Sequence, residues 1–322
     1  MYSLTFTSMR KTKPGKPERE QIVINRKEQN RAKFSKISCS VIGGVFDLAL
    51  SRFPNTVRIE TTNACNAKCV ICPHRNMQRP ACYLDDDIYN RIIDECSKYN
   101  CRNIHLHNFG EPLLDKHLAQ RVEYAKKKGL KRVIIFSNGS VLTADKANEL
   151  MDAGLDEIKI SFDGATKQEF EHIRVPLKFD TIIANIKELV KLRNLRKSPL
   201  KIKVACCSTS DKGETIRTLE DCVDEFSFGR VHNWTDSEMN HAVKSTIRKP
   251  CSRVWQTFTI LSNGKAALCC LDYEGKVVLG DLNKTSISEI WNNESYKKIR
   301  LLHKRAQQDQ ITICKNCTKS FW

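Results

Sequence analysis

Three cysteines close together in the chain are the feature that most restricts what this protein can be. Cys65, Cys69 and Cys72 are separated by three and then by two residues. They follow a short run at 56–60 that is typical of a β-strand, so they lie in the loop after it. Three thiolates on one short loop can hold three irons of a [4Fe–4S] cluster and leave the fourth iron without a protein ligand. An open metal position is a place where chemistry takes place, as at a catalytic zinc.

A zinc site, or three cysteines packed in the core, is the alternative interpretation of these residues. Zinc knuckles usually carry two Cys-x2-Cys pairs, whereas this loop has one x3–x2 triplet. The spacing therefore favours an iron–sulfur cluster.

The triplet, followed by Gly110-Glu111-Pro112, resembles the radical S-adenosylmethionine (radical SAM) family. The resemblance implies that the open iron binds SAM and that the reduced cluster cleaves it to a 5′-deoxyadenosyl radical, which removes a hydrogen atom from a substrate. The cofactor supplies that chemistry and the protein positions it. An electron donor such as flavodoxin or ferredoxin is the expected partner.

The same resemblance predicts which residues contact SAM. The Gly110-Glu111-Pro112 loop would receive the amino group, Ile71 would lie against adenine, and Arg174 would pair with the carboxylate, a group that suits a guanidinium fork. The full set of predicted SAM contacts is Ile71, Gly110, Glu111, Pro112, Ser137, Asn138, Ser161 and Arg174. Arg230, near the expected sixth strand, is predicted to be a base or a substrate anchor.

The fold predicted from the pattern is α/β, with strands and helices alternating as in βα units around a parallel sheet. The expected strands are 56–60, 103–107, 132–136, 157–161, 201–207 and one within 227–233. Six such units form a partial (βα)6 TIM-like barrel of the radical SAM type, two units short of a closed eightfold barrel. The segment 40–53, with Val45 and Leu48, is expected to be a helix packing under this barrel.

A second, different module is expected after the barrel. Asn263-Gly264, between two apolar runs, predicts a β-hairpin, and two helical segments follow at 286–292 and 294–304. The expected division is a basic N-terminal arm and helix at 1–53, the barrel at 54–234, a linker at 235–250 and a small C-terminal α+β iron–sulfur module at 251–322.

A second set of four cysteines lies in that module. Cys251, Cys269, Cys314 and Cys317 could close a metal site completely, and taken alone they suit structural zinc about as well as a cluster. Their spacing resembles the shortened SPASM, or twitch, module, and in particular the deoxy-scyllo-inosamine dehydrogenase family. That resemblance implies one auxiliary [4Fe–4S] cluster. Cys270 is the alternative to Cys269, which is preferred because strand alternation cannot aim both side chains at one cluster.

Composition limits the setting in which the protein works. The chain of 322 residues is 40% hydrophobic, has no apolar run long enough to cross a bilayer and begins without a signal-like apolar segment. Its 15 cysteines then indicate metal or redox chemistry in a reducing cytoplasm rather than disulfides. The remaining cysteines, Cys39, Cys82, Cys96, Cys101, Cys206, Cys207 and Cys222, lack ligand spacing and are expected to be mostly small buried hydrophobes.

The net charge of +17 raises nucleic acid as a partner. However, residues 1–36 carry +7 and residues 297–322 carry +6, so the body contributes only +4. This concentration at the two ends favours a solvated basic arm, and nucleic acid is an unlikely partner.

Three functions are compatible with these features. The first is oxidation of a small carbohydrate or cyclitol, with the auxiliary cluster accepting an electron. The second is modification of a peptide, and the third is a zinc protein that binds nucleic acid. Peptide-modifying relatives often carry a separate leader-binding domain, for which the arm before the barrel is short. The first function is therefore preferred.

Overall fold

One nine-stranded sheet organises the protein. The computed structural model describes residues 16–234 and 246–322, with side chains from residue 27 onward, so part of the expected arm and residues 235–245 of the expected linker lie outside the described residues. The strand order is β6-β5-β4-β3-β2-β1-β7-β8-β9. The first six strands are β1 (Thr56–Ile59), β2 (Asn103–His105), β3 (Val133–Ser137), β4 (Glu157–Ser161), β5 (Lys201–Cys206) and β6 (Glu225–Phe228).

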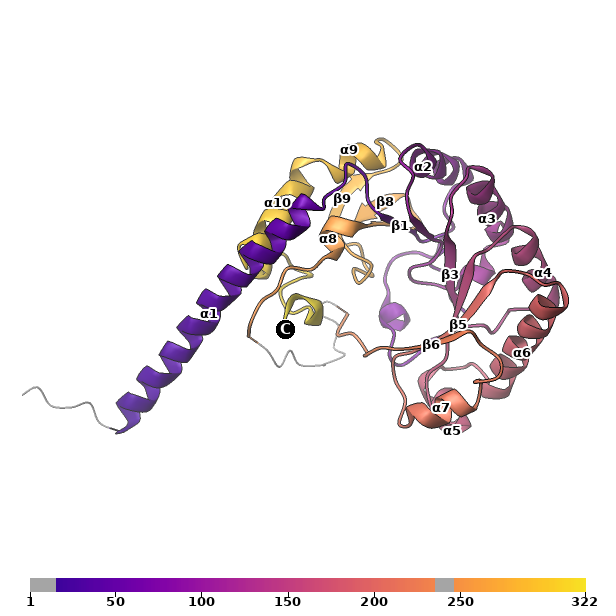
Figure 1. The fold of residues 1–322 in the computed structure, drawn as a ribbon, viewed down its shortest axis with the longest axis horizontal. Coiled ribbons are helices and arrows are strands. Elements are labelled where there is room, and N and C mark those ends of the chain that lie inside the picture. The colour runs from indigo at the N-terminus through magenta and orange to yellow at the C-terminus, as the bar shows by residue number, and fades with distance from the viewer. Residues whose placement is uncertain (1–15, 235–245) are drawn as a thin grey trace, which may run out of the picture.

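Strands β1 to β6 are parallel to their neighbours, and helices connect them along the outside of the curved sheet (Figure 1). Buried side chains such as Val57, Ile59 and Ile135 fill the space between the sheet and these helices. The helices are α2 (Asp86–Lys98), α3 (Leu118–Lys127), α4 (Ala144–Asp152), α5 (Lys167–Ile173), α6 (Phe179–Leu195) and α7 (Lys212–Arg217). The predicted partial (βα)6 barrel is therefore confirmed.

The barrel is not closed, since β6 and β9 are the two edges of the sheet. The prediction that the sixth strand lies within 227–233 was wrong, since β6 begins two residues earlier and ends at Phe228. None of its residues is buried, because β6 is an edge strand whose polar Glu225 and Ser227 alternate with half-buried phenylalanines. Such a strand gives only a weak apolar signal in the sequence.

The C-terminal hairpin continues the same sheet. Strand β7 (Thr257–Ile260) pairs in parallel with β1, while β8 (Lys265–Ala267) and β9 (Val278–Asp281) follow in antiparallel order. The hairpin was predicted at this place, and Gly264 adopts a φ of 78°, which favours glycine in the turn. The helices of this part are α8 (Arg253–Gln256), α9 (Ile287–Trp291) and α10 (Glu294–Lys304). Because β7 lies beside β1, the second set of cysteines is brought next to the barrel.

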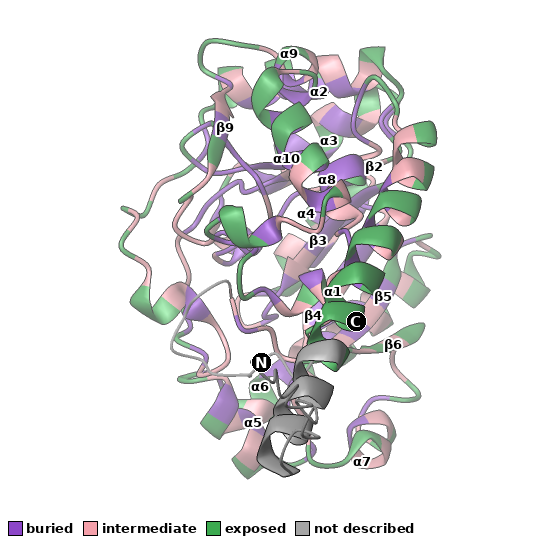
Figure 2. Cartoon of the chain, turned by 90° about the vertical axis from the view of Figure 1, so that its left-hand side faces the viewer, coloured by how far each residue is buried: buried purple, intermediate pink, exposed green. Residues whose placement is uncertain are grey.

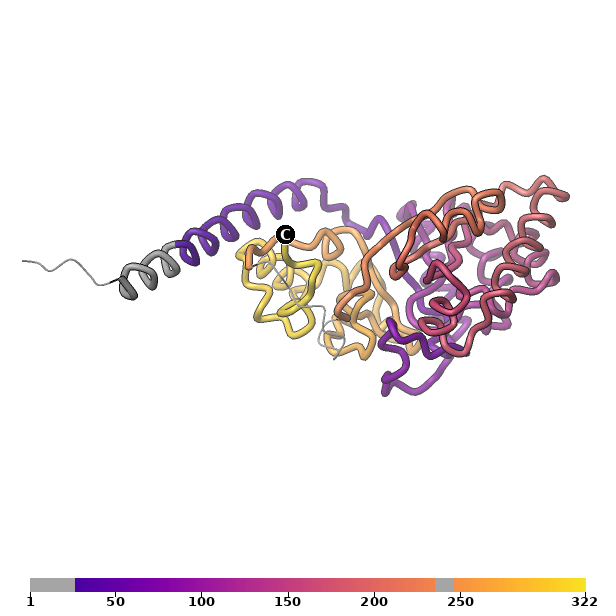
Figure 3. The backbone as a smooth tube through the Cα atoms, turned by 90° about the horizontal axis from the view of Figure 1, so that it is seen from below, coloured from indigo at the N-terminus to yellow at the C-terminus, as the bar shows by residue number. Residues whose placement is uncertain are grey.

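Helix α1 (Lys16–Leu48) corrects the expectation of a helix at 40–53 under the barrel. It is continuous for 33 residues and runs along α10, away from the barrel (Figures 1 and 3). Its packed face combines small, polar and aromatic residues: a Cβ on Gly43 would lie 2.5 Å from Lys304 Cγ, Phe46 packs on Trp255, and Asp47 accepts a 2.7 Å hydrogen bond from Trp255 Nε1. Val45 and Leu48 are exposed instead. Much of the part of α1 that is coloured in Figure 2 is likewise exposed. None of the described helices is long and apolar enough to span a bilayer.

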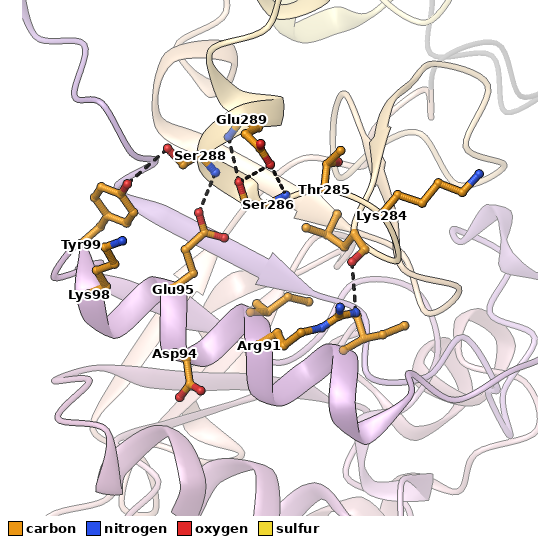
Figure 4. Close-up of a pocket in the computed structure, with 13 residues that line it drawn as sticks. Arg91, Asp94, Glu95, Lys98, Tyr99, Lys284, Thr285, Ser286, Ser288 and Glu289 are labelled. Carbon is orange, nitrogen blue, oxygen red and sulfur yellow. Dashed lines mark hydrogen bonds between the residues drawn. The ribbon is translucent and has the colours of Figure 1, made fainter.

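A groove of about 700 Å³ marks where the C-terminal part meets α2 (Figure 4). The Glu95 carboxylate accepts 2.8 Å hydrogen bonds from the backbone N–H groups of Ile287 and Ser288, the free donors at the start of α9. Arg91 donates to the Leu282 carbonyl oxygen at 3.3 Å. These contacts join the two parts of the chain, and no cysteine lines the groove.

Candidate functional site

A cavity of about 440 Å³ lies at the carboxyl ends of the barrel strands, where barrel enzymes build their sites. The predicted residues that line it are Cys65, Cys69, Ile71, Cys72, Gly110, Glu111, Ser137, Asn138, Ser161, Arg174 and Arg230. Pro112 does not line the cavity; it is buried as the first residue of a short 3-10 helix, Pro112–Leu114. The cavity thus brings together residues that lie far apart in the sequence.

The loop with the cysteine triplet is held by backbone contacts. Lys68 N donates to Val175 O at 2.7 Å and Val70 N to Ile173 O at 2.8 Å, which fixes the loop against the end of α5. Asn138 Nδ2 donates to Asn66 Oδ1 at 2.9 Å, which ties the loop to the end of β3. The positions of the three thiols are therefore set by the barrel rather than by the loop alone.

Burial makes the three thiols of the triplet hard to ionise. It raises the pKa of Cys65 to about 12, with Glu111 adding to the effect, and that of Cys72 to about 11. Burial also raises the pKa of Cys69, although Arg174 opposes the rise. Three neighbouring thiols of this kind become thiolates only when a metal group replaces their protons. The donor set therefore fits the cluster that the spacing predicts.

Glu111 fixes the junction between two loops. Its carboxylate is 1% exposed and accepts hydrogen bonds from Ser137 Oγ at 2.7 Å, Asn138 N at 2.6 Å and Leu113 N at 3.1 Å. Burial raises its pKa despite these donors. Gly110 has a φ of 88°, and a Cβ there would lie 2.5 Å from Thr62 O, so only glycine lets this loop approach the cluster loop.

Arg174 is shared between the cavity and a buried carboxylate. Its Nε donates to Asp163 Oδ2 at 2.8 Å, and its Nη2 donates to the same oxygen. Burial alone would lower the arginine pKa, but the charge and hydrogen bond of Asp163 and the nearby Cys69 and Cys72 together outweigh burial and raise the pKa. Asp163 itself is fully buried and does not line the cavity. Part of the guanidinium predicted for SAM is thus already committed to Asp163.

The second set of cysteines surrounds a small cavity of about 20 Å³ beside the larger one. Cys251, Cys269, Cys314 and Cys317 all line it, together with apolar side chains and His303. Cys270 points elsewhere and lines the larger cavity. Arg253 lines both cavities, and its Nη1 lies 3.9 Å from Cys269 Sγ. The structure therefore groups Cys269, and not Cys270, with the other three thiols.

No three His, Cys, Asp or Glu side chains of the described residues converge on one point as they would around a single metal ion. Each cysteine of a [4Fe–4S] cluster binds a different iron, so its ligands surround a volume rather than a point.

Several cavity residues were not predicted from the sequence. Arg58, His232, Trp234 and Arg253 line the cavity, and Trp234 Nε1 donates to Ile71 O at 2.8 Å. Arg58 could have been found, because alternation in β1 turns it away from the buried Val57 and Ile59. Of the cysteines expected to be small buried hydrophobes, Cys39, Cys96, Cys101 and Cys206 are buried, Cys82 and Cys222 are half-buried, and Cys207 is exposed and lines the cavity. For Cys207 the prediction was wrong, because β5 ends one residue earlier.

Comparison with known families gives two matches. Residues 59–226 match the radical SAM superfamily, and residues 251–318 match the SPASM iron–sulfur cluster-binding domain. Together they cover both cysteine sets. The first match implies SAM and a [4Fe–4S] cluster that binds it, and the second implies an auxiliary iron–sulfur site in the C-terminal part.

Individual relatives differ in what they do. The chain is 24% identical to an S-adenosyl-L-methionine-dependent 2-deoxy-scyllo-inosamine dehydrogenase from Niallia circulans, over 81% of this chain and 91% of that protein. It is 33% identical to a probable GTP 3′,8-cyclase from Methanopyrus kandleri over 56% of this chain, but it spans only 55% of that relative's length. The fold is also similar to Streptococcus suis SuiB bound to the precursor peptide SuiA, with a TM-score of 0.65, 13% identity, and coverage of 98% of this chain and 79% of that one.

Proposed function

Because this chain belongs to the radical SAM superfamily, we propose that it is an oxidoreductase that oxidises a small carbohydrate-like or cyclitol-like substrate. When bound, the first cluster and SAM supply a 5′-deoxyadenosyl radical that removes a substrate hydrogen, and the auxiliary cluster supplies an acceptor for the remaining electron. A flavodoxin or ferredoxin would deliver the reducing electron. We place the protein in the cytoplasm, where its 15 free cysteines would stay reduced.

One observation carries this proposal: the cavity has the first cysteine set on one wall and the C-terminal part on another. Cys65, Cys69 and Cys72 line it together with Cys270 and Arg253, and Arg253 also lines the small cavity of the second set. A substrate bound there would lie between the two cysteine sets. A volume of about 440 Å³ is in the range of small-molecule sites.

The residues of the cavity have separable roles in this proposal. Cys65, Cys69 and Cys72 would hold the first cluster, and Cys251, Cys269, Cys314 and Cys317 the second. Ser161 and Arg174 would orient SAM, with Ile71 against its adenine, while Glu111 holds the ends of β2 and β3 together through Ser137. Trp234 packs edge-on to Phe109 and reaches Ile71, so it would help to exclude water. Arg230, exposed just after β6, would anchor substrate or accept a proton.

The test starts from anaerobically reconstituted protein. About eight irons per chain are expected for two [4Fe–4S] clusters. With dithionite and SAM, the protein should form 5′-deoxyadenosine, and Cys65→Ala, Cys69→Ala or Cys72→Ala should abolish this product. Zinc at both sites without iron uptake would contradict the proposal.

The role of the second set is tested with the Cys314→Ala, Cys317→Ala double variant. If its circular dichroism and the iron of the first cluster are unchanged, it should still form 5′-deoxyadenosine but little oxidised product. A normal rate of product formation would make the second cluster structural.

Peptide modification is the second candidate, favoured by the fold similarity to SuiB over nearly the whole chain. Mass spectrometry separates the two candidates, since the loss of two hydrogens would be found on a small molecule in one case and on a peptide in the other.

A further inference from the structure

Two buried polar groups in the cavity have hydrogen-bonding capacity that the protein does not use. His107 is 5% exposed and lines the cavity; neither of its ring nitrogens has a hydrogen bond of regular geometry, although the Ile134 backbone lies close enough to act on its pKa. Arg58 also lines the cavity, and its buried Nε has no partner. Buried polar groups are nearly always paired, so such groups facing a cavity indicate a missing ligand or water.

The two groups are neighbours. Arg58 Nη2 lies 3.3 Å from His105 Nδ1, and the His105 ring stacks on His107 with 5.2 Å between the centroids. Phe136 also stacks on the His107 ring, with 4.3 Å between the ring centroids. The side chains are therefore held in place by packing, while Arg58 Nε and the His107 ring still have hydrogen-bonding capacity toward the cavity.

The charge of Arg58 is not compensated by a carboxylate. Within residues 27–234 and 246–322, Arg58 forms no ion pair, whereas Arg174 pairs with Asp163 and Lys159 with Glu157. Among the residues that the structure describes, Glu111 is the one carboxylate that lines the cavity, and it is occupied by Ser137 and Asn138. The cavity therefore has a surplus of positive charge.

Arg253 differs from Arg58 because its guanidinium lies beside the second cysteine set. It lies 3.9 Å from Cys269 Sγ and borders the second cysteine set, so its charge is directed at those thiols. Arg58 borders only the larger cavity. Burial, and after it the charge of Arg58, lower the pKa of His107 well below the usual value, so the ring is neutral and carries one N–H and one acceptor nitrogen.

From this arrangement we infer that Arg58 and His107 form a subsite that holds an anionic group of the substrate, a phosphate or a carboxylate. A guanidinium beside a neutral imidazole N–H offers charged and uncharged donors to the same oxyanion. This inference rests on the proposed function and narrows it: the substrate is a small acidic molecule, such as a phosphorylated or carboxylated carbohydrate. Arg230, which also lines the cavity and forms no ion pair among the described residues, would add to the attraction.

The test measures anion binding directly. The reconstituted protein, saturated with SAM so that Arg174 is engaged, is titrated in a calorimeter with inorganic phosphate and, separately, with acetate. One of the two should bind with a stoichiometry near one, and the tighter one identifies the source of the anion. Arg58→Met should weaken that binding by about tenfold or more, and His107→Phe, which keeps the ring stack but removes both nitrogens, by several-fold.

Arg52→Met is the matched control, because Arg52 lies in the same segment but is exposed and outside the cavity. It should bind the anion as the wild type does. If Arg58→Met does not fold by circular dichroism, Arg58→Lys replaces it; this change keeps the charge but loses Nε–H, and weaker binding is again expected.

The inference is overturned if neither anion binds the wild type, or if folded Arg58 and His107 variants bind as tightly as the wild type. A change in iron content of the Arg58 variant with unchanged anion binding would also overturn it, since Arg58 would then serve the second cluster. The proposed function fails separately, through absent iron or absent 5′-deoxyadenosine in the wild type, whatever the anion titration gives.

Discussion

Arg174 donates from both Nε and Nη2 to one oxygen of Asp163, and the other oxygen of Asp163 accepts from the backbone N–H groups of Cys207 and Ser208. One buried carboxylate thus connects the end of α5 to the end of β5, behind the cavity that Arg174 lines. The pair is part of the core, and its arginine is one of the predicted SAM contacts.

Asp163→Asn is expected to destabilise the protein by about 3 kcal/mol or more, because it leaves a buried guanidinium without its counter-charge. Arg174→Ala should in addition weaken SAM binding without changing the iron content. Anaerobic urea unfolding and SAM titration measure the two effects. Asp152→Asn is the control: the Arg196–Asp152 pair is exposed, and its loss should change the free energy of unfolding by about 0–1 kcal/mol. Unaltered SAM affinity in Arg174→Ala would remove Arg174 from the site.

The adjacent cysteines Cys269 and Cys270 should behave differently when substituted. Cys269→Ala is expected to lower the iron content by about four per chain, because Cys269 borders the small cavity with Cys251, Cys314 and Cys317. Cys270→Ala should keep all the iron, since Cys270 faces the larger cavity. Iron and sulfide analysis of both variants decides this, and equal iron loss in the two would show that the cavity assignment does not identify the ligand.

Gly110→Ala should disturb the first cluster site more than the same substitution at another glycine with a positive φ would. Gly110 and Gly129 both have a positive φ, but a Cβ would meet Thr62 O at 2.5 Å at Gly110 and nothing within 4 Å at Gly129. Gly129→Ala is therefore expected to cost about 1–2 kcal/mol from backbone strain alone. Gly110→Ala should cost more and should also lower iron retention, measured after gel filtration. Similar stability and iron content in the two variants would mean that the loops can separate without harm.

Glu95 should contribute to the attachment of the C-terminal part to the barrel. Its carboxylate accepts from Ile287 N and Ser288 N at the start of α9, where a negative charge is favourable (Figure 4). Glu95→Ala is expected to reduce the free energy of unfolding by about 1–2 kcal/mol. Asp94→Asn on the same helix is the control, since Asp94 is half exposed in its pair with Lys128 and should matter by less than about 1 kcal/mol. Equal effects of the two substitutions would rule out a special role for Glu95.

His105 should make the protein less stable in acid. Burial, and after it the charges of Arg58, Lys159 and Arg132, together lower its pKa to about 3. The folded protein keeps this histidine neutral, while the unfolded chain takes up a proton below pH 6.5. The free energy of unfolding is therefore highest above pH 6.5 and decreases as the pH falls toward 3. Between pH 6.5 and pH 5, the free energy of unfolding should fall by up to about 2 kcal/mol less in His105→Gln than in the wild type. Between pH 6.5 and pH 8, the two proteins should show the same pH dependence. Urea unfolding at the three pH values checks this; identical pH profiles would contradict it.

Much of the local structure could be predicted from the sequence because it depends on short-range patterns. The predicted strands from 56–60 to 201–207 correspond to β1 to β5 within two residues at their ends. The Asn263-Gly264 turn produced the predicted hairpin. Errors occurred where that signal was weak: β6 has no buried residue, and α1 turns Val45 and Leu48 to solvent while Gly43 packs against Lys304.

The candidate site was predictable only in part for a related reason. Ligand spacing within one loop singled out Cys65, Cys69 and Cys72, and the chemistry of thiolates then indicated a cluster. Neither spacing nor alternation could tell that Arg174 is shared with Asp163, because the two side chains meet only when the end of α5 packs against the segment that follows β4.

By itself, the sequence determined the kind of chemistry and the class of fold, since cysteine spacing and the alternation of strands and helices are properties of neighbouring residues. The tertiary structure decided which distant groups act together. The parallel pairing of β7 with β1 brings the second cysteine set beside the cavity, and the same packing leaves Arg58 and His107 facing it without partners. Such relations depend on which edge of the sheet a later strand joins, and that choice follows from burial over the whole chain rather than from any single segment.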